Sequence, residues 1–168
     1  MTHPVDPNAL AFLVGQPCWG IVGGAGTGSM ISLRLGQKIP RDVPLTNDKL
    51  SREIRENDAE FEACLFCCSW RLVSPAAIVC SGAWSSNEPD GPMLAGLAQL
   101  QQQKISEIKL TPETLDLSLT FENGLRLDVF NDYPAESPDH TAFWIETPNS
   151  RFLITGFRFD VETRADSG

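Results

Sequence analysis

The strongest constraint on the fold is the stretch TLDLSLTFENGLRLDVF, residues 114–130. Apolar and polar side chains alternate in it with a period of two on both sides of Asn123-Gly124. Such alternation is typical of half-buried β-strands. Asn-Gly is a dipeptide that tight hairpin turns prefer, because the turn residues need positive φ angles. The stretch therefore predicts an antiparallel hairpin, and a fold built largely from such hairpins.

Further strand pairs are predicted along the chain. Short β-branched and aromatic runs at 18–23 and 29–35 flank a glycine-rich segment, and AFWIETP is followed by RFLITGFRFDV. A strand over 60–72 precedes its hairpin partner over 77–84. Because the 60–72 strand is apolar on both faces, we predict a central position for it, covered on both sides.

Two helices interrupt these strands. The longer one is predicted over 92–104, where Pro92 lies in the first turn and apolar residues recur at helical spacing. A shorter helix is predicted over 47–56, with Thr46 or Asn47 as its N-cap. The predicted class is α+β, with mostly antiparallel β-sheet, one longer helix and one short helix.

The length and composition predict one domain over residues 1–168. The sequence shows no internal repeat and no second domain boundary. We expect the termini, 1–10 and 163–168, to be loose.

The segment GGAGTGS, residues 23–29, invites comparison with a phosphate-binding loop. The Walker spacing would put Ser29 where the lysine belongs, and the dinucleotide spacing meets Ser29 in place of its last glycine. A strand pattern follows the glycines, whereas a phosphate loop leads into a helix. We therefore predict a turn in which Gly26 and Gly28 are structural, and no nucleotide cofactor.

The charge balance narrows the classes of partner. The chain has 22 Asp and Glu against 13 Lys and Arg, a formal net charge of −9. This charge disfavours non-specific binding to nucleic acid and docking on anionic membranes. It suits a basic protein partner, although an acidic surface can also serve solubility alone. No stretch approaches the roughly 18–20 apolar residues of a membrane helix, so we expect a cytoplasmic protein.

No constellation of catalytic or metal-binding residues is recognisable. The five cysteines form an odd set, which favours reduced thiols. Cys64 and Cys67 lie three apart on a predicted strand and would point to opposite faces. The only histidines, His3 and His140, lie near an end and in a polar loop. We predict no metal, no cofactor and no enzymatic activity.

Arg71 and the tryptophans are interpreted as structural. Arg71 follows Trp70 in a central strand, and Glu62 or Asp128 could pair with it; anion binding is the functional alternative. Trp70 and the other tryptophans all lie in predicted strands, where core or cross-strand packing is expected, although they could also line a ligand pocket. The other tryptophans are Trp19, Trp84 and Trp144.

The segment CLFCCSWRLVSPAAIVCSG resembles the central hairpin of small, uncharacterised bacterial domains. Their signature is an apolar strand ending in C-x-W-R-[LI], followed later by a hairpin and a W-x-[ILV] strand; here these are LSLTFENGLRLDVF and FWIETP. Such domains resemble immunity proteins of polymorphic-toxin systems. The resemblance implies a protein without a catalytic site that binds a toxin, and it makes Cys68, Trp70 and Arg71 core-forming positions. It transfers no binding residue.

The leading hypothesis is therefore a non-catalytic acidic protein that neutralises a cognate, basic toxin domain. Binding residues are expected on loops, with Tyr133 as an aromatic anchor. The candidates are Glu88 and Asp90 in SSNEPDG, and Asp132, Tyr133, Glu136 and Asp139 in NDYPAESPDH. The alternative is a small-molecule-binding or enzymatic domain, with a pocket between the sheet and the 92–104 helix.

Overall fold

The computed structural model describes residues 5–134 and 139–164. In these residues eleven strands form two antiparallel sheets. The six-stranded sheet contains, in spatial order, β1 (Cys18–Val22), β2 (Ile31–Pro40), β3 (Asn57–Leu65), β9 (Thr141–Glu146), β10 (Ser150–Thr155) and β11 (Arg158–Thr163). The five-stranded sheet contains β5 (Ile78–Ser81), β4 (Ser69–Val73), β8 (Arg126–Phe130), β7 (Leu117–Phe121) and β6 (Ile105–Leu110).

The helices are few and short. They are α1 (Arg52–Glu56), α2 (Pro92–Leu97) and two 3-10 turns, Ala11–Leu13 and Ala98–Leu100. The predicted α+β class, mostly antiparallel sheet with minor helix, is confirmed.

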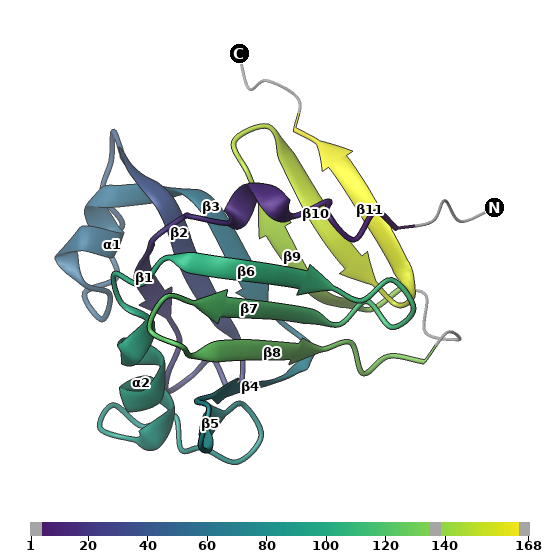
Figure 1. The fold of residues 1–168 in the computed structure, drawn as a ribbon. Helices are drawn as coiled ribbons and strands as arrows, with labels where there is room; N and C mark the ends of the chain where they lie inside the picture. Colours follow the sequence, from purple (N-terminus) through teal and green to yellow (C-terminus); the bar gives the residue numbers. More distant parts are fainter. Residues whose placement is uncertain (1–4, 135–138, 165–168) are drawn as a thin grey trace.

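The two sheets face each other, and their strands cross at a steep angle (Figure 1). The apolar core between them receives Leu33 and Phe143 from one sheet and Trp70 and Leu127 from the other. Leu10, inside the segment expected to be loose, is 1% exposed and belongs to the same core. The alternation of each strand thus buries one row of side chains and leaves the other outside.

The predicted hairpins are confirmed. β1 pairs with β2, β4 with β5, β7 with β8, and β9 with β10, all antiparallel. The glycine-rich segment joins β1 to β2, as expected. Gly26 and Gly28 have φ angles of 91° and 63°, and an added Cβ at either position would meet open space. Their role is therefore conformational.

The predicted strand over 60–72 is wrong as a single element. The chain leaves the six-stranded sheet after β3 and enters the five-stranded sheet as β4. The intervening Phe66 and Cys67 both donate their backbone N–H to the Ala142 carbonyl (3.0 Å each). Apolar residues on both faces of this stretch reflect the change of sheet.

Both helix predictions are too long. α2 and its 3-10 continuation end at Leu100, because the glutamines that follow pair with β1: Cys18 donates to the Gln103 carbonyl (2.8 Å). The short helix begins at Arg52. Its N-cap is Ser51, whose Oγ accepts the Ile54 N–H (3.3 Å), and not Thr46 or Asn47.

The chain follows the same path twice, which the sequence did not indicate. In each half, a 3-10 turn leads into three successive strands of one sheet, and a hairpin of the other sheet follows. The halves are β1–β2–β3 with β4–β5, and β6–β7–β8 with β9–β10. Each sheet therefore combines three strands of one half with a hairpin of the other, and β11 extends the six-stranded sheet.

Backbone hydrogen bonds where the halves begin show the same two-fold relation. Gly15 donates to the Ile105 carbonyl (2.7 Å), and Gln102 donates to the Cys18 carbonyl (2.6 Å). Gly15 and Gln102 each lie two residues after their 3-10 turn, and their φ angles are 86° and 65°. An irregularity in strand pairing directly follows both Cys18 and Ile105. The backbone thus shows a repeat that the amino-acid sequence does not.

Candidate partner-binding surface

Trp84 is the most exposed of the large apolar side chains in the described part of the chain, at 94%. It lies in a turn that ends β5. The Ser81 N–H donates to the Ser85 Oγ (2.9 Å), and the Trp84 N–H donates to the Ser81 Oγ (3.3 Å). These bonds satisfy backbone donors locally, so the chain turns away from the sheet before Trp84. The expectation that Trp84 packs in a strand is therefore wrong.

A surface hollow of about 450 Å³ lies beside this tryptophan, and we call it the Trp84 groove. It runs over β4 and β5, and its lining includes Arg71, Ile78, Trp84 and Phe130. Ile78 is 61% exposed. An exposed tryptophan beside an exposed aliphatic side chain leaves apolar surface in water, which is a common mark of an interaction site.

Arg71 forms the polar side of the groove. Its Nε lies 3.4 Å from Asp128 Oδ2, and its guanidinium carbon lies 5.2 Å from the centre of the Phe130 ring. The predicted carboxylate partner is thus Asp128, whereas Glu62 accepts a hydrogen bond from Ser32. The side chain of Arg71 is 44% exposed, so Arg71 lies on the outer face and not in the core.

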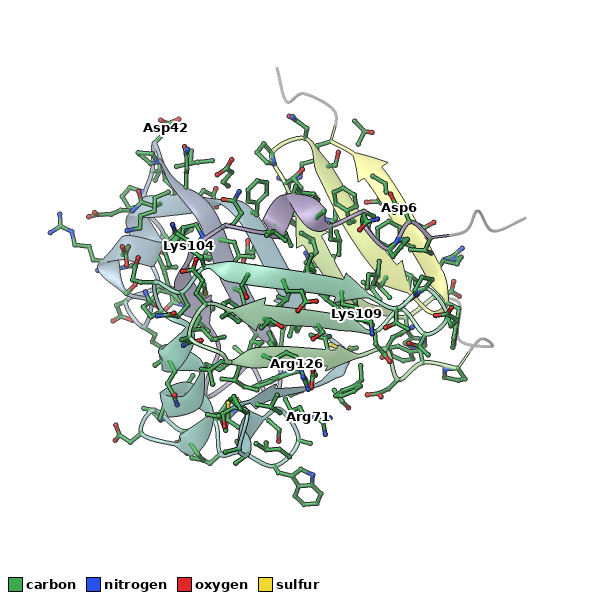
Figure 2. All side chains as sticks on the ribbon, viewed as in Figure 1. Asp6, Asp42, Arg71, Lys104, Lys109 and Arg126 are labelled. Carbon is green, nitrogen blue, oxygen red and sulfur yellow. The ribbon has the colours of Figure 1, made fainter. Side chains whose placement is uncertain are left out.

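Asp128 also forms an ion pair with a second arginine. Arg126 donates from Nε (2.7 Å) and Nη2 (3.1 Å), and Ser118 Oγ donates at 3.2 Å. Figure 2 shows Arg71 and Arg126 close together on the face of the five-stranded sheet. Burial alone would raise the pKa of Asp128, but the hydrogen bonds and charge of Arg126, with Ser118 and Arg71, outweigh it and lower the pKa.

Replacing Asp128 by asparagine is expected to weaken the acid dependence of stability. A carboxylate whose pKa is lowered on folding stabilises the protein above its unfolded pKa of about 3.9. That contribution is lost as the pH falls through the lower, folded pKa. Urea unfolding from neutral pH to about pH 2 should show the two proteins converging in acid. A constant difference at every pH would contradict this account.

Asp132 lies beside the groove, is exposed, and bonds the backbone of β4. Its Oδ2 accepts the backbone N–H of Ser69 (3.0 Å), and Ser69 lines the Trp84 groove. Tyr133 stacks on His140, with ring centres 5.0 Å apart, and packs against the core. Burial raises the pKa of Tyr133, and the neighbouring Cys67 thiol acts in the same direction. Tyr133 is therefore partly buried against the fold, and its role as an aromatic anchor stays a prediction.

The same loop contains two further candidate residues, Asp139 and Glu136. Asp139 is exposed. Glu136 lies outside the described residues.

Glu88 and Asp90 are both exposed, in the loop that follows Trp84. The Asn87 side chain ties this loop to the glycine-rich turn, donating to the carbonyls of Gly24 (3.1 Å) and Gly28 (3.3 Å). The acidic loop therefore has a defined course beside the Trp84 groove. Sequence reasoning named Trp84 only as a packing or pocket-lining residue and missed its exposure, although the run Ser85-Ser86-Asn87 of turn-forming residues directly after it was the available signal.

Four of the five cysteine thiols are not activated as nucleophiles. All five thiols are free. Burial raises the pKa of Cys18, Cys64 and Cys68 to about 12 and that of Cys80 to about 11, so these thiols stay protonated near neutral pH. Cys67 is exposed. Within residues 5–134 and 139–164, no three Cys, His, Asp or Glu side chains are arranged to hold a metal ion.

Comparison with known proteins finds no matching family model, no matching curated protein and no matching solved structure. In the part of the chain that the structure describes, no helix has the length and apolar character needed to cross a membrane.

Proposed function

We propose that this chain is a non-catalytic binding protein that neutralises a cognate bacterial toxin by direct contact. The observation that carries the proposal is the exposed Trp84 at the rim of an apolar groove. Tryptophan and arginine are the residues that binding hot spots favour, especially where surrounding contacts exclude water. Arg71 on β4 and Trp84 in the turn after β5 supply both. The toxin as partner follows from the resemblance to immunity proteins.

The charge of the protein supports a basic partner. The net charge is −9, and the exposed Glu88 and Asp90 follow Trp84 in the chain. Opposite charges accelerate encounter and select among partners, while the desolvated aromatic contact sets the lifetime of the complex. A toxin that acts on nucleic acid needs a basic substrate groove. An acidic protein bound over that groove would block it.

Replacing Trp84 by alanine is expected to weaken the complex about 30-fold or more, the effect of losing a hot-spot contact of about 2 kcal/mol. The measurement is calorimetric titration of the chain against a basic toxin domain, sought first among the products of the neighbouring genes. The free energy of unfolding should stay unchanged, because Trp84 makes no core contact. Phe157→Ala is the matched control, since Phe157 is an exposed aromatic residue (43%) in the turn between β10 and β11.

The loop that carries Glu88 and Asp90 provides a second variant for the same experiment. Glu88→Lys together with Asp90→Lys should slow association and reduce its dependence on salt, with a smaller effect on dissociation. Undiminished affinity of the Trp84→Ala variant would remove the groove from the interface. Failure of the unaltered chain to bind or inhibit the toxin domain would overturn the proposed function.

A second candidate function is the binding of a small molecule. The observation that favours it is a cavity of about 370 Å³ at the place that the sequence suggested, between the sheet and α2. This volume is within the range of small-ligand sites.

A further inference from the structure

The cavity between β1 and the helices is a candidate ligand site separate from the Trp84 groove. Its floor is β1, one wall is formed by residues 49–51 and 53–54 at the start of α1, and the opposite wall by α2 and its 3-10 continuation. Figure 1 shows β1 and both helices gathered on one side of the molecule. The cavity therefore joins elements from three distant parts of the sequence.

Both walls are fixed by contacts with the rest of the fold. Ile54 is 6% exposed and anchors α1, and Leu97 is 1% exposed and anchors α2. The side-chain amide of Gln101 donates to the Trp19 carbonyl, which ties the end of the second wall to the floor. The cavity is thus preformed, and a ligand would not need to order its walls.

The lining combines apolar side chains with polar ones from both walls, among them Ser51 and Gln101. Its apolar part is formed by Ile21, Leu50, Ile54, Leu94 and Leu97, and Trp19 also lines it. An aliphatic or aromatic body of modest size would bury its surface against these side chains.

Among the charged side chains that line the cavity, the one without an ion-pair partner in the described part of the chain is a cation. Its two charged lining residues are Lys49 and Glu53. Glu53 forms an ion pair with Lys38, whose Nζ also lies 5.5 Å from the centre of the Trp19 ring. In residues 5–134 and 139–164, no carboxylate lies within ion-pair distance of Lys49. Lys49 is exposed, so its ammonium is available to an anionic ligand from solvent.

We propose that this cavity binds a small carboxylate with an apolar body. The apolar body lies between α1 and α2, and the carboxylate pairs with the Lys49 ammonium at the rim. The site needs neither the Trp84 groove nor a protein partner. It gives the chain a second, independent binding activity.

The test is a titration of the isotope-labelled full chain with octanoate, octanol and octylammonium, followed by the backbone amide signals of β1. Octanoate is expected to shift the signals of Gly20, Ile21 and Gly23 saturably, octanol to bind more weakly, and octylammonium to bind weakest. Lys49→Gln should lower the affinity for octanoate about fivefold, the upper range for a partly exposed ion pair, and leave octanol unchanged. Lys109→Gln on β6 (Figure 2), outside the cavity lining, should change neither.

A pair of alanines tests the location. Ala98 and Ala95 are both exposed and close together in the chain, but only Ala98 lines the cavity. Ala98→Phe should fill the space and abolish binding of octanoate and octanol, whereas Ala95→Phe should leave both intact. Equal affinity for octanoate and octylammonium, no saturable shift in β1, or equal effects of the two phenylalanines would overturn the proposal. None of these outcomes bears on toxin binding, which is measured with the Trp84 variant.

Discussion

Replacing Trp70 by alanine is expected to lower the free energy of unfolding by about 3–5 kcal/mol, the range for a large buried aromatic residue. Trp70 is 2% exposed in the core between the sheets. Its indole N–H donates to the Ser29 carbonyl (2.7 Å), at the end of the glycine-rich turn. The variant therefore loses apolar packing and also leaves a carbonyl of the opposite sheet's hairpin without its partner.

Urea unfolding measures this change, and Trp84→Ala is its matched control. The same substitution at Trp84, which is 94% exposed, should alter stability by less than about 0.5 kcal/mol. The two variants thus separate the structural tryptophan from the one proposed to bind a partner. Near-normal stability of the Trp70 variant would mean that β4 does not occupy the centre of the core.

Replacing Gly36 by alanine is expected to cost about 2–4 kcal/mol, from backbone strain together with steric overlap. Gly36 in β2 has a φ angle of 77°, which side-chain-bearing residues rarely adopt. A Cβ there would lie 2.7 Å from Glu60 Oε2 and 2.9 Å from Phe61 Cδ2. The Glu60 carboxylate can move aside, but Phe61 packs against the core and cannot move freely.

Gly28→Ala isolates the backbone part of this effect. Gly28 also has a positive φ angle, 63°, but its added Cβ would meet open space. Its alanine variant should cost about 1–2 kcal/mol, the strain of the left-handed conformation alone. The difference between the two variants, measured by thermal or urea unfolding, gives the steric part. Equal losses would show that β2 accommodates a side chain at Gly36.

Only part of the candidate site could be predicted from the sequence. Glu88 and Asp90 were predicted as exposed loop residues from their turn-forming neighbours, and their positions agree. Asp132 and Tyr133 were chosen by the same reasoning, yet a backbone N–H and a histidine ring engage them. Local composition identifies a loop, but it does not reveal which side chains the rest of the fold will occupy.

The sequence by itself determined the hairpins, the α+β class and the burial of Trp70. Alternation, turn residues and apolar runs act between residues close together in the chain, so the local structure that they produce can be predicted from short segments. Only the tertiary structure decided where the chain changes sheets after β3, where α2 ends, and that its two halves exchange hairpins. It also left Trp84 in water, because the Ser81–Ser85 bonds end β5 before that residue. These features depend on hydrogen bonds and packing between segments far apart in the chain, and strand alternation is the same whichever sheet a strand joins.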